Sequence, residues 1–260
     1  MATDTATQEK LDIGRVIQTT LAIVGRNFGL LAGLSGLMIV IPYALVLAAM
    51  IPFAGSFMTG GAPAAMASLF PLILGILLVF ALIWAAFQAA AMHVAITDLN
   101  GARPNFGTSL GVGVRNALPV IAVVILAMLA VWAGLILLIV PGIMIAIAFI
   151  LAVPARVVEK AGVFQSFSRS RALTRNNRWR IFALLFVYMI TVWVLELVIA
   201  SLTGGFAPTN MGLIVLRGLM GLVVSFVGGM VTTTGIATLY FELRRIKEGV
   251  GPSELAAVFD

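Results

Sequence analysis

Residues 117–155 form one apolar run without a charged side chain. As a single helix, this run would be roughly 58 Å long at 1.5 Å per residue, about twice the hydrocarbon core of a bilayer. Pro141-Gly142 lies inside the run and favours a turn, because proline cannot donate a helix hydrogen bond. The sequence therefore predicts two antiparallel helices joined by a hairpin at Pro141-Gly142, the second ending near Pro154.

The remaining apolar runs are also long enough to cross a membrane, which takes about 20 residues. The predicted spans are Phe28–Ile51, Phe70–Ile96, Ala117–Ile139, Gly142–Ala155, Ile181–Leu202 and Met211–Phe241. The chain is 62% hydrophobic and 10% charged, whereas a soluble domain is about 45–50% apolar and about 25% charged. The expected fold is an all-α, polytopic membrane helix bundle of six transmembrane helices with cytoplasmic interfacial amphipathic helices.

The charges predict the direction of the spans. Segments 1–27, 97–116, 156–180 and 242–260 hold three, two, seven and three of the 16 Lys and Arg residues, whereas the predicted outer loops 52–69, 140–141 and 203–210 hold no charge. Positive charge marks the cytoplasmic side, so both termini are expected there. The net charge of +6 therefore favours anionic lipids of the inner leaflet as partners, and not nucleic acid.

Two of the cytoplasmic segments have helical apolar spacing and are expected to lie in the interface. In 1–27, residues such as Leu11, Val16 and Leu21 would form the lipid-facing side. In 156–180, Val163, Phe164, Phe167 and Leu173 would face lipid. The cations of this second segment form a predicted basic collar, which either fixes topology only or recognises an anionic lipid or a protein partner: Arg169, Arg171, Arg175, Arg178 and Arg180.

An internal repeat is suggested by similar residues before spans one, three and five. Thr19-Thr20-Leu21 precedes Arg26-Asn27, and Thr108-Ser109-Leu110 precedes Arg115-Asn116 at the same spacing, while Arg175-Asn176 has only Ser168 upstream. The hypothesis is a single membrane domain of three units, each an interfacial segment followed by a helical hairpin. Its parts are 1–27 with 28–96, 97–155, and 156–180 with 181–241, followed by a cytoplasmic tail, 242–260.

Small residues at four-residue spacing predict close helix packing in the first and last spans, either within the chain or with another copy. They are Gly25, Gly29 and Gly33, and Gly221, Ser225 and Gly229. Glu196 and Arg217 are the charges inside spans, each roughly 9 Å from the outer end, and we expect them to form an ion pair. The alternatives are that Arg217 extends outward or that the charges serve transport.

Catalytic chemistry has no positive signal. His93 is the only histidine, there is no cysteine, and no triad, phosphate loop or dinucleotide fingerprint is present. No cofactor, no metal site and no enzymatic activity are expected. The tail is expected to continue the last helix to a glycine stop at Gly249 and to form a short helix over Glu254–Val258 capped by Ser253.

Several segments resemble one bacterial membrane family. They are Leu11–Val16, Gly25–Phe28, Ile139–Ile143, Ala152–Pro154, Arg169–Arg175, Tyr240–Arg245 and Ala256–Asp260. Together they resemble the glycerophosphoryl diester phosphodiesterase membrane domain and, more loosely, YciC-like inner-membrane proteins. The resemblance implies a bacterial inner-membrane location without the catalytic barrel, for which one histidine and 260 residues leave no room.

The leading functional hypothesis is a non-enzymatic lipid-associated scaffold, or an accessory subunit of a membrane complex that binds a protein partner or another copy of itself. The alternative is a small transporter or channel with a polar path along Glu196, Arg217, Gln88 and His93.

Overall fold

The computed structural model describes residues 10–205 and 210–249, and within those ranges the chain is helical and contains no strand. The helices are α1 (Ile13–Arg26), α2 (Phe28–Leu99), α3 (Phe106–Leu137), α4 (Ile139–Phe149), α5 (Ala152–Glu159), α6 (Val163–Thr174), α7 (Arg178–Leu202) and α8 (Met211–Glu248). Six segments are long and apolar enough to cross a bilayer: Phe28–Ala48, Pro71–Leu99, Phe106–Leu137, Ile139–Glu159, Arg178–Leu202 and Met211–Glu248. The predicted all-α fold with six membrane spans is confirmed.

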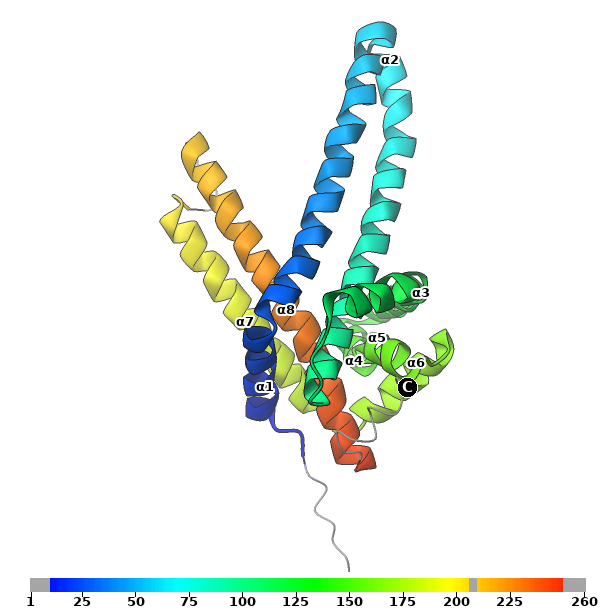
Figure 1. Ribbon diagram of the computed structural model, residues 1–260, viewed down its shortest axis with the longest axis vertical. Helices are drawn as coiled ribbons and strands as arrows, with labels where there is room; N and C mark the ends of the chain where they lie inside the picture. Colours follow the sequence, from blue (N-terminus) through cyan, green and yellow to red (C-terminus); the bar gives the residue numbers. More distant parts are fainter. Residues whose placement is uncertain (1–9, 206–209, 250–260) are drawn as a thin grey trace, which may run out of the picture.

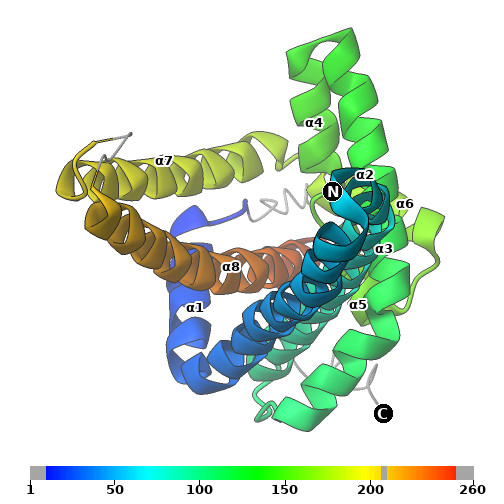
Figure 2. The same ribbon diagram turned by 90° about the horizontal axis from the view of Figure 1, so that it is seen from above.

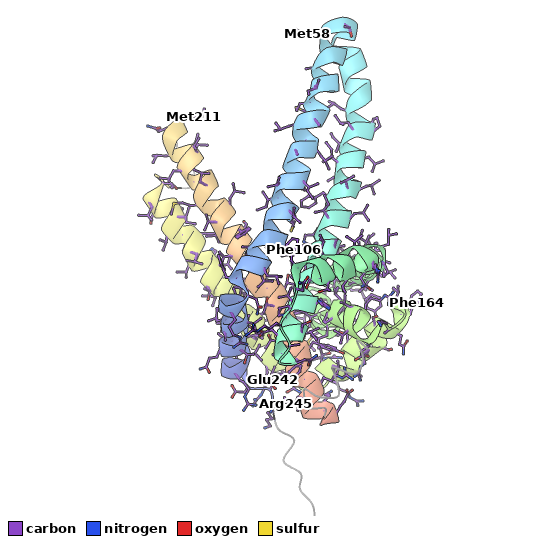
Figure 3. The ribbon with its side chains drawn as sticks, in the orientation of Figure 1. Met58, Phe106, Phe164, Met211, Glu242 and Arg245 are labelled. Atoms are coloured by element: carbon purple, nitrogen blue, oxygen red, sulfur yellow. The ribbon has the colours of Figure 1, made fainter. Side chains whose placement is uncertain are left out.

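Three helical hairpins diverge from a shared base (Figures 1 and 2). The first is α2 folded back on itself, the second is α3 with α4, and the third is α7 with α8. Met58 and Met211 lie at the far tips of the first and third hairpins, while Glu242 and Arg245 lie at the opposite end (Figure 3). The hairpins therefore carry the apolar spans, and the charged residues gather at the base.

The first hairpin turns at Gly61, whose φ of 71° and ψ of −174° favour glycine. Because this one residue reverses the chain, both arms remain helical up to the turn. The predicted outer loop over 52–69 is therefore wrong, since these residues are helical on both sides of Gly61.

The predicted hairpin between spans three and four exists, but its break lies at Leu138, which is extended with φ −166° and ψ 151°. Pro141 is instead the third residue of α4, in the first turn, where a missing N–H costs no helix hydrogen bond. Pro154 is likewise the third residue of α5, so the fourth helix ends at Phe149 and not near Pro154. Both prolines therefore begin helices that they were predicted to interrupt or end.

The interfacial segments form helices, although their apolar sides meet protein and not only lipid. The Asp12 side chain caps α1 by accepting from the Arg15 amide at 3.1 Å. Leu11 and Val16, expected to face lipid, are 1% exposed, and Leu173 of α6 is equally buried. Leu21 does remain exposed at 56%. These two helices therefore help to form the core at the base as well as its surface.

The repeat hypothesis receives partial support from α1 and α6. Residues 11–26 and 161–176 have the same order of buried, half-buried and exposed positions, with Thr20 opposite Ser170. The next pair in this register is Asn27, which is half-buried, and Asn177, which is buried. The sequence alignment on Arg175-Asn176 is one residue away from this register. In the second unit, residues 106–116 are continuous with the span in α3 and do not form a separate helix.

The core lies at the base, where α1, α2, α5, α6 and α8 meet. Its large buried members are Leu11, Ile23, Met92, Ile96, Leu151, Leu173, Tyr240 and Leu243. By contrast, only 6% of the apolar window of α7 is buried inside the protein. The third hairpin therefore presents most of its surface to its surroundings.

Candidate functional sites at the base and between the helices

A network of charged side chains joins α5, α6 and α8. The Arg169 Nε donates to both carboxylate oxygens of Glu159, at 2.8 and 2.9 Å, and its Nη1 pairs with Glu248. The Tyr240 hydroxyl donates to Glu159, and Arg244 pairs with Glu248 at 2.9 Å. Burial lowers the pKa of Arg169, but its hydrogen bonds to Glu248 and Glu159 outweigh this effect and raise the pKa overall. Arg169 therefore remains charged and holds α6 against the two neighbouring helices.

Further polar contacts fix α1 in place. The Leu11 amide donates to Asn177 at 3.4 Å, and the Leu11 carbonyl accepts from Arg180 at 2.6 Å. At the other end of α1, Arg26 donates to Asp98 at 2.6 Å. This hydrogen bond, together with the charge of Asp98, raises the pKa of Arg26. Both ends of α1 are therefore tied to the membrane helices that flank it.

Ser170 forms hydrogen bonds with backbone groups at the junction between α4 and α5, where the helical hydrogen bonding is interrupted. Its hydroxyl donates to the Ala148 carbonyl at 2.7 Å and accepts from the Leu151 amide at 3.1 Å. Buried backbone groups must find such partners wherever a helix is interrupted. Ser170 is fully buried, so its role is to support the α4–α5 junction.

The exposed side of α6 carries a row of residues that we call the α6 stripe: Phe164, Ser168, Arg171 and Arg175. Their spacing of four, three and four residues places them on one helix face. Phe164 is 79% exposed and points away from the bundle (Figure 3), and Trp179 beyond the stripe is 76% exposed. The Arg171 guanidinium lies 5.7 Å from the centre of the Phe149 ring.

The predicted basic collar therefore divides into two kinds of residue. Arg169 and Arg180 bind other parts of the chain, whereas Arg171 and Arg175 are exposed and Arg178 is half-buried. Arg171 and Arg175 form no ion pair with any carboxylate of residues 10–205 and 210–249. The sequence does not distinguish these two groups, because their charges and spacing are alike.

The polar residues of the second span connect helices. The Thr233 hydroxyl donates to Gln88 Oε1 at 2.6 Å, which links α8 to α2. His93 Nδ1 lies 3.1 Å from the hydroxyl of Ser109, which is fully buried in α3. Gln88 and His93 thus contact different neighbouring helices, α8 and α3.

Glu196 and Arg217 do not form the ion pair that the sequence predicts. Arg217 Nη1 donates to the Gly205 carbonyl at 2.6 Å, near the outer end of α7. A Glu196–Arg217 ion pair is not among those formed by the described part of the chain. The side chain of Arg217 instead extends toward the outer end of the hairpin, as the snorkelling alternative expects.

Most of the predicted small-residue contacts are also absent among residues 10–205 and 210–249. A Cβ built on Gly25, Gly29, Gly221 or Gly229 would find no atom within 4 Å, and Ser225 is exposed. Of this set, Gly33 alone approaches another helix, because the Phe106 ring lies 3.1 Å from its built Cβ. The helix is interrupted at Asn27, so Gly25 lies on α1 whereas Gly29 and Gly33 lie on α2. The predicted close packing within the chain is therefore found at Gly33 and not at Gly25, Gly29, Gly221 or Gly229, and contact with another copy stays a prediction.

Close approach occurs instead at glycines that the sequence analysis did not select. A Cβ on Gly113 would lie less than 3.0 Å from the Ala86 carbonyl oxygen, and one on Gly142 would lie 2.5 Å from the Leu135 side chain. Gly113 lies where α3 packs against α2, and Gly142 lies where α4 packs against α3. The alanines of the second span, from Ala85 to Ala91, were a usable signal for the first contact, because small side chains permit close helix packing.

Residues 10–205 and 210–249 contain no group of three or more His, Asp or Glu that could hold a metal ion. Gly249, with φ 65°, caps α8 as predicted. The predicted helix over Glu254–Val258, capped by Ser253, falls outside the described residues.

A family model described as "Domain of unknown function (DUF7847)" matches residues 124–243. The matched part extends from the middle of α3 to the inner part of α8 and includes the α6 stripe and Glu159. No curated protein and no solved structure matches the chain. The similarity is thus to a family whose description carries no activity, and it covers the second and third hairpins.

Proposed function

We propose that the chain is a non-enzymatic membrane scaffold that associates with anionic lipids through the α6 stripe. The observation that carries the proposal is the combination of two exposed guanidinium groups with two exposed aromatic rings at the base. Phe164 and Trp179 are more than three-quarters exposed, and Arg171 and Arg175 are exposed as well. Aromatic rings favour the membrane–water interface, and cations favour an anionic leaflet.

The carboxylates of the base strengthen this assignment, because all the described ones are already engaged. Asp12 caps α1, Asp98 binds Arg26, Glu242 pairs with Arg15 and Arg245, and Glu159 and Glu248 bind Arg169. Lys247 lies within electrostatic reach of Arg175 and adds positive charge to the stripe. Arg171 and Arg175 are therefore exposed cations without a neighbouring carboxylate among the described residues, which leaves them accessible to an anionic headgroup.

The orientation of the protein is part of the same proposal. The base holds most of the cations, and segments 52–69, 140–141 and 203–210 at the opposite ends hold none. We therefore assign the base and both termini to the cytoplasmic side of a bacterial inner membrane. The resemblance to the glycerophosphoryl diester phosphodiesterase membrane domain supports this location and a role without catalysis. Transport is the weaker alternative, because Gln88 and His93 bind separate helices.

The test compares charge-neutral variants in detergent-purified protein. Arg171→Gln/Arg175→Gln removes the stripe cations, and Arg103→Gln/Arg115→Gln removes two other exposed cations as a matched control. Each cation near an anionic surface contributes about 1 kcal/mol, so the stripe variant should bind phosphatidylglycerol roughly 30-fold more weakly. Mass spectrometry of retained phosphatidylglycerol and phosphatidylcholine provides the readout.

The control variant should retain phosphatidylglycerol as the wild type does. Equal loss in both double variants, or equal retention of both lipids by the wild type, would refute a specific role for the stripe. The same spectra report whether a protein partner or a second copy accompanies the chain. Raising the salt concentration should weaken the preference, because exposed charges are screened.

A further inference from the structure

A long apolar groove of about 520 Å³ lies between α7 and α8. Its walls are formed by residues 184–195 of α7 and 223–239 of α8, and Val16, Ile17, Thr20 and Leu21 of α1 contribute at one end together with Ile150. None of the lining residues is charged. Because both walls belong to membrane spans, the groove opens to hydrocarbon and not to water.

The polar side chains of the groove need no ligand. Tyr188 donates to the Gly228 carbonyl at 3.3 Å and accepts from Thr232 at 2.7 Å. Thr20 and Thr191 donate to carbonyls one turn back on their own helices, at 2.7 and 2.9 Å. A polar substrate would therefore lose its hydration without gaining new hydrogen-bond partners, whereas a hydrocarbon chain would lose nothing.

The dimensions of the groove fit one lipid tail. The lining segments extend roughly 17 Å along α7 and 24 Å along α8 at 1.5 Å per residue, and one leaflet of hydrocarbon is about 15 Å thick. The groove is therefore at least as long as one leaflet is thick, and a single extended acyl chain can lie along it between the two helices.

We propose that this groove is a binding site for one acyl chain of a phospholipid. The lining residues nearest the base are Val16, Leu184 and Leu239. Immediately beyond them, Arg15 lies 3.8 Å from Glu242, and Arg180 holds the Leu11 carbonyl. A lipid whose tail fills the groove places its phosphate beside these two guanidinium groups, so the site favours a phospholipid over a lipid without phosphate.

This inference deepens the proposed lipid association, but it rests on different residues from the α6 stripe. The experiment uses phosphatidylglycerol that carries a diazirine on one acyl chain, reconstituted with the full chain and activated by light. Cross-links should concentrate on the peptides containing residues 184–195 and 223–239, and excess unlabelled phosphatidylglycerol should reduce them. An even distribution over all lipid-exposed helices would overturn the proposal.

A pair of tryptophan substitutions adds a matched comparison. Val224→Trp fills the groove, whereas Leu222→Trp adds the same side chain at an exposed position of α8 outside it. Cross-linking to the α7 and α8 peptides should fall about tenfold in the first variant, since the tail can no longer be buried there, and should be unchanged in the second. Equal cross-linking in the two variants would also overturn the proposal.

The Arg171→Gln/Arg175→Gln variant separates this site from the proposed function. If the groove binds a tail independently, cross-linking in it persists when the stripe cations are removed. If cross-links are evenly distributed while phosphatidylglycerol retention still depends on the stripe, the groove site is refuted and the scaffold proposal stands. Cross-links between two copies at the groove would assign it to oligomerisation and contradict the acyl-chain site.

Discussion

The contact of α3 with α2 at Gly113 gives a quantitative test of the fold. A methyl group on Gly113 would lie less than 3.0 Å from the Ala86 carbonyl oxygen and 2.9 Å from the Ala90 methyl group. The neighbours are a backbone group and the Cβ of a buried residue, so neither can rotate away. Gly113→Ala must therefore move one helix relative to the other, and such overpacking costs about 1–3 kcal/mol.

Gly111 provides the matched control, because a Cβ at this position of α3 meets no atom within 4 Å. Replacing either glycine by alanine gains about 0.8–1.0 kcal/mol of helix propensity, so this gain cancels in a comparison of the two variants. Gly111→Ala should thus be more stable than wild type, and Gly113→Ala should lie about 1–3 kcal/mol below Gly111→Ala. Unfolding in mixed micelles of increasing SDS fraction, followed by circular dichroism, measures the difference. Equal stability of the two alanine variants would refute the close packing of α2 and α3.

Three further predictions concern polar side chains. Glu159→Gln should lower stability by about 1.5–3 kcal/mol in the same unfolding assay, because its carboxylate accepts hydrogen bonds from a guanidinium and a phenol; an unchanged stability would contradict this network. A double-mutant cycle of Gln88→Leu and Thr233→Val should give a coupling of about 0.6 kcal/mol, as is typical of hydrogen bonds between membrane helices, and strict additivity would exclude the bond. Glu196→Gln and Arg217→Gln should instead be additive within about 0.5 kcal/mol, whereas a larger coupling would indicate an ion pair.

The number of spans could be predicted from the sequence because membrane crossing depends on length and apolar composition, which are local properties. The position of a turn depends on finer detail. Pro141 indicates the region of the turn between α3 and α4. However, proline is also well accommodated in the first turn of a helix, and the helix is interrupted three residues earlier, at Leu138. The turn at Gly61 could not be located either, because nothing in the neighbouring sequence distinguishes a one-residue turn from a longer loop.

The contacts between helices were harder to predict than the helices themselves. Four-residue spacing shows which residues share a face, but it does not show whether that face meets another helix, and most of the selected glycines face open space. The charges had the same ambiguity. Arg169 and Arg171 are two residues apart, yet one is enclosed by Glu159 and Glu248 and the other is exposed, because α6 turns them to different sides.

The length of the first hairpin has a consequence for the membrane around it. The arm of α2 before Gly61 would be roughly 50 Å long at 1.5 Å per residue, against a hydrocarbon core of about 30 Å. Its outer part carries no charge, and Ile51 and Met58 are 75% and 87% exposed, so an upright arm would hold apolar side chains in water. The arm must therefore lean or the bilayer must thicken beside it, at a cost of fractions of a kcal/mol per ångström. Hydrophobic mismatch alone then favours thicker regions of the bilayer as the surroundings of this protein.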